Sequence, residues 1–105
     1  MLSKKLIFNF LDFIKKGRYI MKLTYIESRL KQVFSDVLEI PKDKINNNTS
    51  PRTIESWDSL QHVVLISAIS EEFSITIDPR ISIEMLSFEK TLEKIILLLK
   101  EKSHF

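Results

Sequence analysis

The sequence lacks cysteine, which excludes disulfide bonds and thiolate metal sites. A cytoplasmic protein is therefore expected, and any thiol chemistry would need a thiol from outside the chain. One glycine and three prolines are too few for the many turns of an all-β fold. No apolar run is long enough to span a bilayer. The two histidines, His62 and His104, lie far apart in the sequence and give no support to a metal site.

The 105 residues are enough for one small domain, expected to be monomeric. Their formal net charge of +2 hides an asymmetry, because residues 1–20 hold five basic residues against one acid, a net +4. Residues 21–105 therefore carry −2, and no Lys or Arg occurs between Thr53 and Pro79. The basic residues are not on a candidate recognition helix, which disfavours a helical nucleic-acid binder, and no nucleic-acid partner is expected.

Residues 1–20 form a basic N-terminal extension, and three interpretations of it remain open. They could be a helix that packs on the domain or a partner, or an amphipathic membrane-surface segment. They could also be an over-long start, with Met21 as the functional first residue. The third interpretation is preferred, because a complete domain pattern begins just after Met21 and would occupy residues 21–105.

Residues 21–105 predict an all-α fold with four helices, a long loop between the first two and a short third helix. Thr24 and Glu27 have the spacing of a capping box, which predicts that the first helix begins there and ends near Pro41. Polar turn formers then predict a loop to Trp57, attached to the core by Ile45 and Ile54. Later apolar periodicity predicts helices over 58–73, within 79–86 and over 88–102, the last capped by Ser87.

The helix over 58–73 begins with Asp58, a favourable N-cap residue, followed by Ser59. Its apolar residues fall on two faces, and a small helix rarely needs two. Leu65, Ile66, Ile69 and Phe73 are assigned to the core. The opposite face is predicted to be a partner-docking patch, and it consists of Leu60, Val63 and Val64 with Ser67 and Glu71.

Two residues beside Ser59 have more than one interpretation. Trp57 is expected to be a partly buried ring that shields the loop. His62 lies one helical turn from Ser59, where it could contact a partner or a phosphate. A solvated histidine is the preferred interpretation of His62.

Over about residues 22–102 the sequence resembles the acyl carrier and peptidyl carrier protein superfamily. The resemblance rests on this order of helices and on two motifs of the second helix, which begins with Asp58-Ser59-Leu60 and ends with Glu71-Glu72-Phe73. The resemblance implies a four-helix carrier without catalytic residues of its own. It implies that a phosphopantetheinyl transferase attaches 4'-phosphopantetheine from coenzyme A to Ser59, with Asp58 helping to position the metal-bound coenzyme A. A loading ligase and a downstream transferase or synthase would then use the arm to carry an acyl or aminoacyl thioester.

The sequence departs from the fatty acid carriers of that family near the motif. Those carriers typically have a glycine shortly before Asp-Ser-Leu and an acid after it, where this chain has Ser56-Trp57 and Gln61-His62. The departures favour a carrier dedicated to one pathway, such as a nonribosomal peptide, polyketide or polysaccharide-modifying system. The alternative from a different class is an unmodified helical interaction module that docks through Leu60, Val63 and Val64.

Overall fold

A computed structural model describes the backbone of residues 4–102 and the side chains of residues 16–102. In that part of the chain the fold consists of helices and no strands, which confirms the predicted all-α class. Helix α1 (Lys4–Leu38) is followed by a long loop that contains a short 3-10 helix, η1 (Lys42–Lys44). Helices α2 (Ser59–Phe73), α3 (Pro79–Ser82) and α4 (Phe88–Glu101) complete the order.

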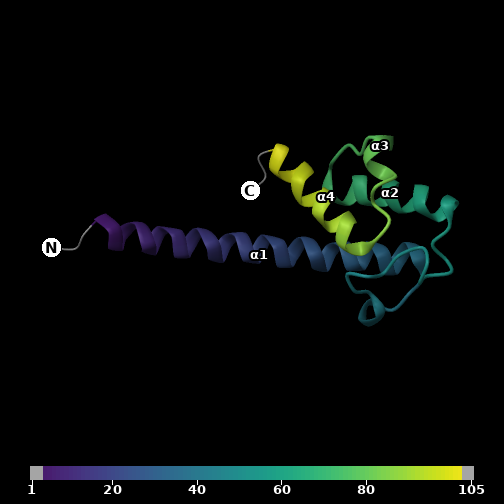
Figure 1. The fold of residues 1–105 in the computed structure, drawn as a ribbon, viewed down its shortest axis with the longest axis horizontal. Coiled ribbons are helices and arrows are strands. Elements are labelled where there is room, and N and C mark those ends of the chain that lie inside the picture. Colours follow the sequence, from purple (N-terminus) through teal and green to yellow (C-terminus); the bar gives the residue numbers. More distant parts are fainter. Residues whose placement is uncertain (1–3, 103–105) are drawn as a thin grey trace.

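Helices α2 and α4 lie beside the C-terminal half of α1, and the N-terminal half of α1 extends away from them (Figure 1). The molecule measures 62 × 28 × 19 Å, and its long dimension follows α1. None of the helices in the described part of the chain is both long and apolar enough to cross a bilayer.

The predicted start of the first helix at Thr24 is wrong. Helix α1 continues through Thr24 without a break, and the Thr24 hydroxyl donates to the Ile20 carbonyl one turn earlier instead of capping a helix end. The Glu27 carboxylate forms an ion pair with Lys31 on the next turn, with 3.7 Å between Oε1 and Nζ. The Thr-x-x-Glu spacing is therefore a mid-helix coincidence, since both side chains find partners along a continuous helix.

The core lies between α1, α2, α4 and the long loop. Phe34 of α1 is fully buried and meets two rings edge-to-face, Trp57 at 5.3 Å and Phe88 at 5.1 Å between centroids. The apolar residues at helical spacing in the second half of α1 are buried, except that Val37 is half-buried; they are Ile26, Leu30, Val33, Phe34 and Val37. Around Phe34 the buried side chains are Ile26, Leu30, Val33, Leu38, Ile45, Trp57, Leu65, Ile69, Ile75, Met85, Phe88, Ile95 and Leu99.

The long loop is held at both ends and in the middle by specific hydrogen bonds. The Ser56 hydroxyl donates to the Leu38 carbonyl at 2.7 Å, which satisfies a free carbonyl at the end of α1. Backbone carbonyls of Asn47 and Thr49 accept from Glu89 and Phe88, the first residues of α4. The predicted attachment of the loop through Ile45 and Ile54 is confirmed, because Ile45 is buried and Ile54 packs against the core.

The later helices begin close to where the sequence places them, because each has a local cap. Asp58, Asp78 and Ser87 each accept a backbone N–H from the first turn of α2, α3 and α4. Ser74 ends α2 in the left-handed conformation, with φ of 52°, and its N–H reaches back to the last turn. The third helix is shorter than the predicted window and ends at Ser82.

Candidate functional site

Ser59 is the first residue of α2 and is exposed. The Asp58 carboxylate accepts the Gln61 N–H at 2.8 Å, and the Asp58 carbonyl accepts the His62 N–H at 2.9 Å. Asp58 is therefore the N-cap, as the sequence predicts. Among the described residues the Ser59 hydroxyl has no hydrogen-bond partner, so it is not used to stabilise the fold. The site offers an accessible hydroxyl next to unpaired backbone N–H groups of a helix N-terminus.

The side chains of Trp57 and His62 form a hydrogen-bonded pair next to Ser59. The Trp57 ring is only 2% exposed, more buried than the sequence suggested, and its Nε1 donates to His62 Nδ1 at 3.0 Å. The two rings are stacked, with centroids 6.0 Å apart. His62 Nε2 lies 2.9 Å from the Ser82 carbonyl of α3. Because the indole can only donate, Nδ1 must accept, which assigns the proton to Nε2 and makes it the donor to Ser82.

The preferred interpretation of His62 as a solvated residue is wrong. Its side chain is half-buried and both ring nitrogens are bonded within the protein. His62 connects the residue before the Asp58 cap to α3, so it positions the structure around Ser59. Sequence reasoning missed Ser82 as its partner, and no sequence pattern identifies a contact made by a backbone carbonyl twenty residues away.

A surface hollow of about 480 Å³ lies directly beside Ser59. Its walls are formed by side chains from three segments: Pro51 of the loop, Trp57, Asp58 and His62 around the start of α2, and Leu86 before α4. Pro51 and Leu86 were not predicted as site residues, because their sequence positions suggest only a turn and the end of the segment expected to hold the short third helix. The hollow places apolar surface within reach of any group attached to Ser59.

The predicted apolar face of α2 is accessible. Leu60, Val63 and Val64 are 70%, 65% and 44% exposed, whereas Leu65 and Ile69 on the core side are fully buried. Ile83 and Leu86 after α3 are also exposed apolar residues. Ser67 and Glu71 are exposed further along α2. The prediction that α2 has one buried and one exposed apolar face is thus confirmed.

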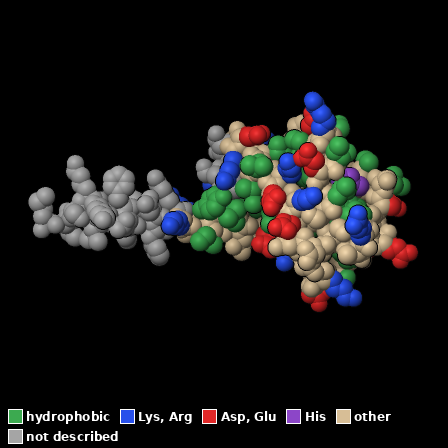
Figure 2. All heavy atoms as spheres, viewed as in Figure 1, with side chains coloured by type: hydrophobic (Ala, Val, Ile, Leu, Met, Phe, Trp, Pro, Cys, Tyr) green, Lys and Arg blue, Asp and Glu red, His purple; other side chains and the backbone are tan. Residues whose placement is uncertain are grey.

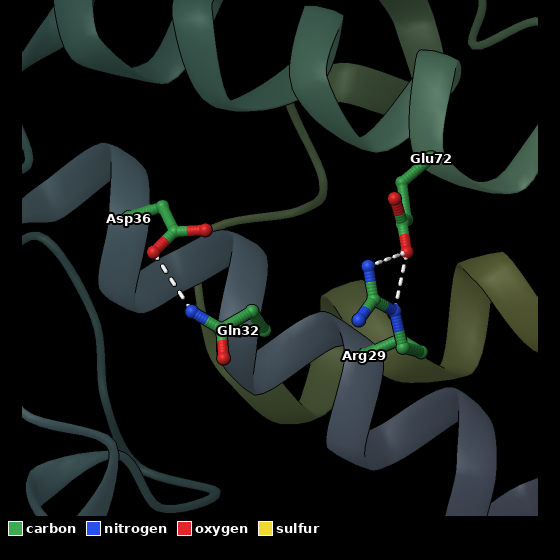
Figure 3. Close-up of polar contacts among 4 residues, drawn as sticks. All are labelled: Arg29, Gln32, Asp36 and Glu72. Atoms are coloured by element: carbon green, nitrogen blue, oxygen red, sulfur yellow. Dashed lines mark hydrogen bonds and ion pairs between the residues drawn. The ribbon is translucent and has the colours of Figure 1, made fainter.

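The acidity near α2 is partly neutralised by a contact that the sequence does not reveal. Arg29 of α1 forms an ion pair and a hydrogen bond with Glu72, while Gln32 donates to Asp36 one turn further along (Figure 3). The Arg80 Nε lies 3.5 Å from the Asp78 Oδ1.

Glu71 and Glu55 have no ion-pair partner among the described residues. The accessible negative charge near α2 therefore includes Glu55, Asp58 and Glu71, together with Asp36 of α1, whose partner Gln32 is neutral.

One carboxyl group outside the site has a shifted pKa. Lys94 of α4 donates a hydrogen bond to Glu84 at 2.8 Å, and this bond and the lysine charge lower the pKa of Glu84. Glu84 follows α3, so the contact joins the connector after α3 to α4. Among the described residues no group of three or more His, Cys, Asp or Glu side chains could hold a metal ion.

Known proteins with similar sequences indicate which family this chain belongs to. A family model described as the phosphopantetheine attachment site matches residues 28–95, more than half of the chain. The chain is also 37% identical over 70 residues to an acyl carrier protein of Buchnera aphidicola subsp. Schizaphis graminum, an alignment that covers 67% of this chain and 89% of that protein. With its all-helical fold, the chain therefore belongs to the acyl carrier and peptidyl carrier protein superfamily.

Proposed function

We propose that Ser59 carries the phosphopantetheine that the family uses to hold acyl groups. The observation that supports this most directly is the position of Ser59, the exposed first residue of α2. Its hydroxyl has no hydrogen-bond partner among the described residues. The buried Trp57 fixes the backbone before Ser59, and the Asp58 carboxylate holds the Gln61 N–H after it. A serine held in this way can enter a transferase active site without local unfolding.

The attachment step uses the chain only as a nucleophile. The Ser59 oxygen attacks the β-phosphorus of coenzyme A, a new phosphodiester bond forms and the pyrophosphate bond breaks. Adenosine 3',5'-bisphosphate leaves, and the hydroxyl proton passes to a base on the transferase. The product phosphodiester is favoured at this position because the first backbone N–H groups of α2 and its dipole stabilise negative charge.

The bound group would supply the thiol that this cysteine-free chain lacks. Its thioester would carry an acyl or aminoacyl group, and tethering raises the effective concentration of that group at each enzyme visited. The chain itself needs no catalytic residue for this role, because the family acts as carriers rather than enzymes. A loading ligase and a downstream transferase or synthase are the partners implied.

The partner surface would be the exposed apolar face of α2 with its acidic end. Leu60, Val63 and Val64 offer apolar contact close to Ser59, and Ser67 and Glu71 continue the same helix. His62 would contribute by positioning α3, since both of its ring nitrogens are occupied. Ser56-Trp57 and Gln61-His62, in place of a glycine and an acid, support a carrier dedicated to a peptide, polyketide or polysaccharide-type pathway.

The mass of the intact protein tests the attachment. Incubation with coenzyme A, magnesium and a promiscuous phosphopantetheinyl transferase should add the mass of one phosphopantetheine. Ser59→Ala should stay at its encoded mass, while the matched variant Ser28→Ala, at an exposed serine of α1 outside the partner-docking patch, should be modified like the wild type.

The same measurement decides between the carrier and a second candidate function. The exposure of Leu60, Val63 and Val64 would also suit an unmodified interaction module. An unmodified wild type, under conditions where a control carrier is fully modified, would favour that module and contradict the proposal.

A further inference from the structure

Some apolar residues of α1 lie outside the face that packs against the domain. At about 100° per residue, Ile26, Leu30, Val33, Phe34 and Val37 centre on the face that packs against the domain. Ile20, Met21 and Tyr25 lie outside that face and are 60%, 74% and 65% exposed. Met21 and Tyr25 also border a hollow that they share with Phe73 of α2 and Leu99 of α4. Figure 2 shows hydrophobic side chains gathered where α1 leaves the globular part. Ile20, Met21 and Tyr25 are called the outer apolar face.

The sequence continues this face towards the N-terminus. Within the continuous helix Lys4–Leu38, the positions on the same arc of about 140° include five more apolar residues, Leu6, Ile7, Phe10, Phe13 and Ile14. No charged residue falls within that arc between positions 4 and 25. Beyond Tyr25 the arc becomes polar, with Ser28, Lys31, Gln32 and Ser35. The face therefore ends where α1 joins the domain, and it spans roughly 30 Å along the helix.

The charge of the segment indicates what covers this face. Residues 1–20 carry five basic residues and one acid, and Lys16 and Arg18, both exposed, flank the arc on its two sides. A second copy would bring the same +4 charge against itself. A negatively charged surface would neutralise the basic flanks instead, and long basic side chains at the edge of an apolar face can reach such a surface.

We propose that α1 docks the carrier on an anionic lipid membrane. The outer apolar face would enter the boundary between headgroups and acyl chains, while the basic flanks contact acidic headgroups. A lipid surface is favoured over a protein groove because the apolar arc is wide and continuous over about five turns. Met21 and Tyr25 line the same hollow as Phe73 at the end of α2, so Ser59, the first residue of that helix, lies away from this face and stays exposed.

Flotation of the full-length protein with vesicles tests the proposal. Binding to vesicles with roughly one-third phosphatidylglycerol in phosphatidylcholine should exceed binding to phosphatidylcholine alone by about tenfold at low salt. Met21→Glu and Tyr25→Glu should each reduce this binding by about tenfold, and Lys16→Glu/Arg18→Glu should reduce it to the level seen with neutral vesicles. Leu97→Glu is the matched control, because Leu97 is an apolar residue of α4 that is 53% exposed and lies outside the face.

Two outcomes would overturn the proposal. The first is equal recovery with anionic and neutral vesicles, or equal effects of Met21→Glu and Leu97→Glu. The second is absence of vesicle binding together with a dimer, seen by sedimentation velocity, that Met21→Glu dissociates. That result would assign the outer apolar face to a second copy. Modification of Ser59 is measured separately by mass, so neither outcome bears on the carrier function.

Discussion

At the scale of single residues, the site depends on side chains that face inward as much as on Ser59 itself. Trp57 and His62 satisfy each other's polar atoms below the attachment point, and His62 extends the contact to the Ser82 carbonyl. Thr91 is also fully buried, because its hydroxyl donates to the Ser87 carbonyl at 2.7 Å. Neither arrangement is visible in the sequence, where His62 reads as a polar surface residue and Thr91 interrupts an apolar stripe.

Replacing His62 tests how much this pair stabilises the protein. His62→Phe keeps an aromatic ring but leaves the buried Trp57 N–H without an acceptor, so it should lower the free energy of unfolding by about 1–3 kcal/mol. Urea denaturation measures the loss, and Ser67→Ala on the exposed side of α2 should stay within about 0.5 kcal/mol of the wild type.

A double-mutant cycle with Trp57→Phe isolates the hydrogen bond from the other effects of each substitution. The two changes should be less than additive by about 1 kcal/mol, because the second removes a donor that the first has already left unpaired. Additive losses would show that the contact contributes nothing of its own.

At the scale of elements, local caps explain why α2 and α4 were predictable from the sequence. Asp58 and Ser87 lie next to the N–H groups they accept, so each helix start is encoded within four residues. The start of α1 was not predictable, because the Thr24 hydroxyl has an alternative acceptor in Ile20 that exists only if the helix continues. The contact of Arg29 with Glu72 joins positions 43 apart, and sequence spacing does not indicate which acid an arginine will meet.

Asp58 has two proposed roles that substitutions can separate. Asp58→Asn retains a good N-cap and should leave the stability of α2 nearly unchanged, whereas Asp58→Ala should cost about 1 kcal/mol. If the carboxylate also positions the transferase complex, both variants should slow phosphopantetheine attachment to Ser59. Urea denaturation gives the first quantity, and the rate of mass increase gives the second. Modification of Asp58→Asn at the wild-type rate would limit Asp58 to capping.

At the scale of the whole molecule, one helix gives the protein two unlike ends. The globular end holds the core, the long loop and Ser59, and the N-terminal half of α1 extends from it (Figure 1). Charge divides in the same way, with +4 in residues 1–20 and −2 in the rest. Composition revealed this division of charge, but the continuity of α1 through residue 21 was not among the preferred interpretations. Whether residues 21–105 alone form the carrier domain stays a prediction.

The overall dimensions give a direct test of this continuity. The Cα radius of gyration is 16.9 Å, whereas a compact domain of this length would have about 13 Å. Small-angle X-ray scattering of the full-length protein should give a value close to the larger figure and an elongated distance distribution. A value near the smaller figure would mean that the N-terminal half of α1 folds back against the domain.

The hydrogen bonds between the long loop and α4 have a consequence for how this segment can vary. Asn47 and Thr49 hold the start of α4 through their carbonyl oxygens, and every residue type has such an oxygen. The exposed side chains of Asn47 and Asn48 are therefore open to replacement by many residue types, whereas the Asn46 side chain accepts the Asn48 N–H at 2.8 Å. An inserted or deleted residue would instead move both carbonyls away from α4. In this segment the number of residues is therefore constrained more strictly than their identity.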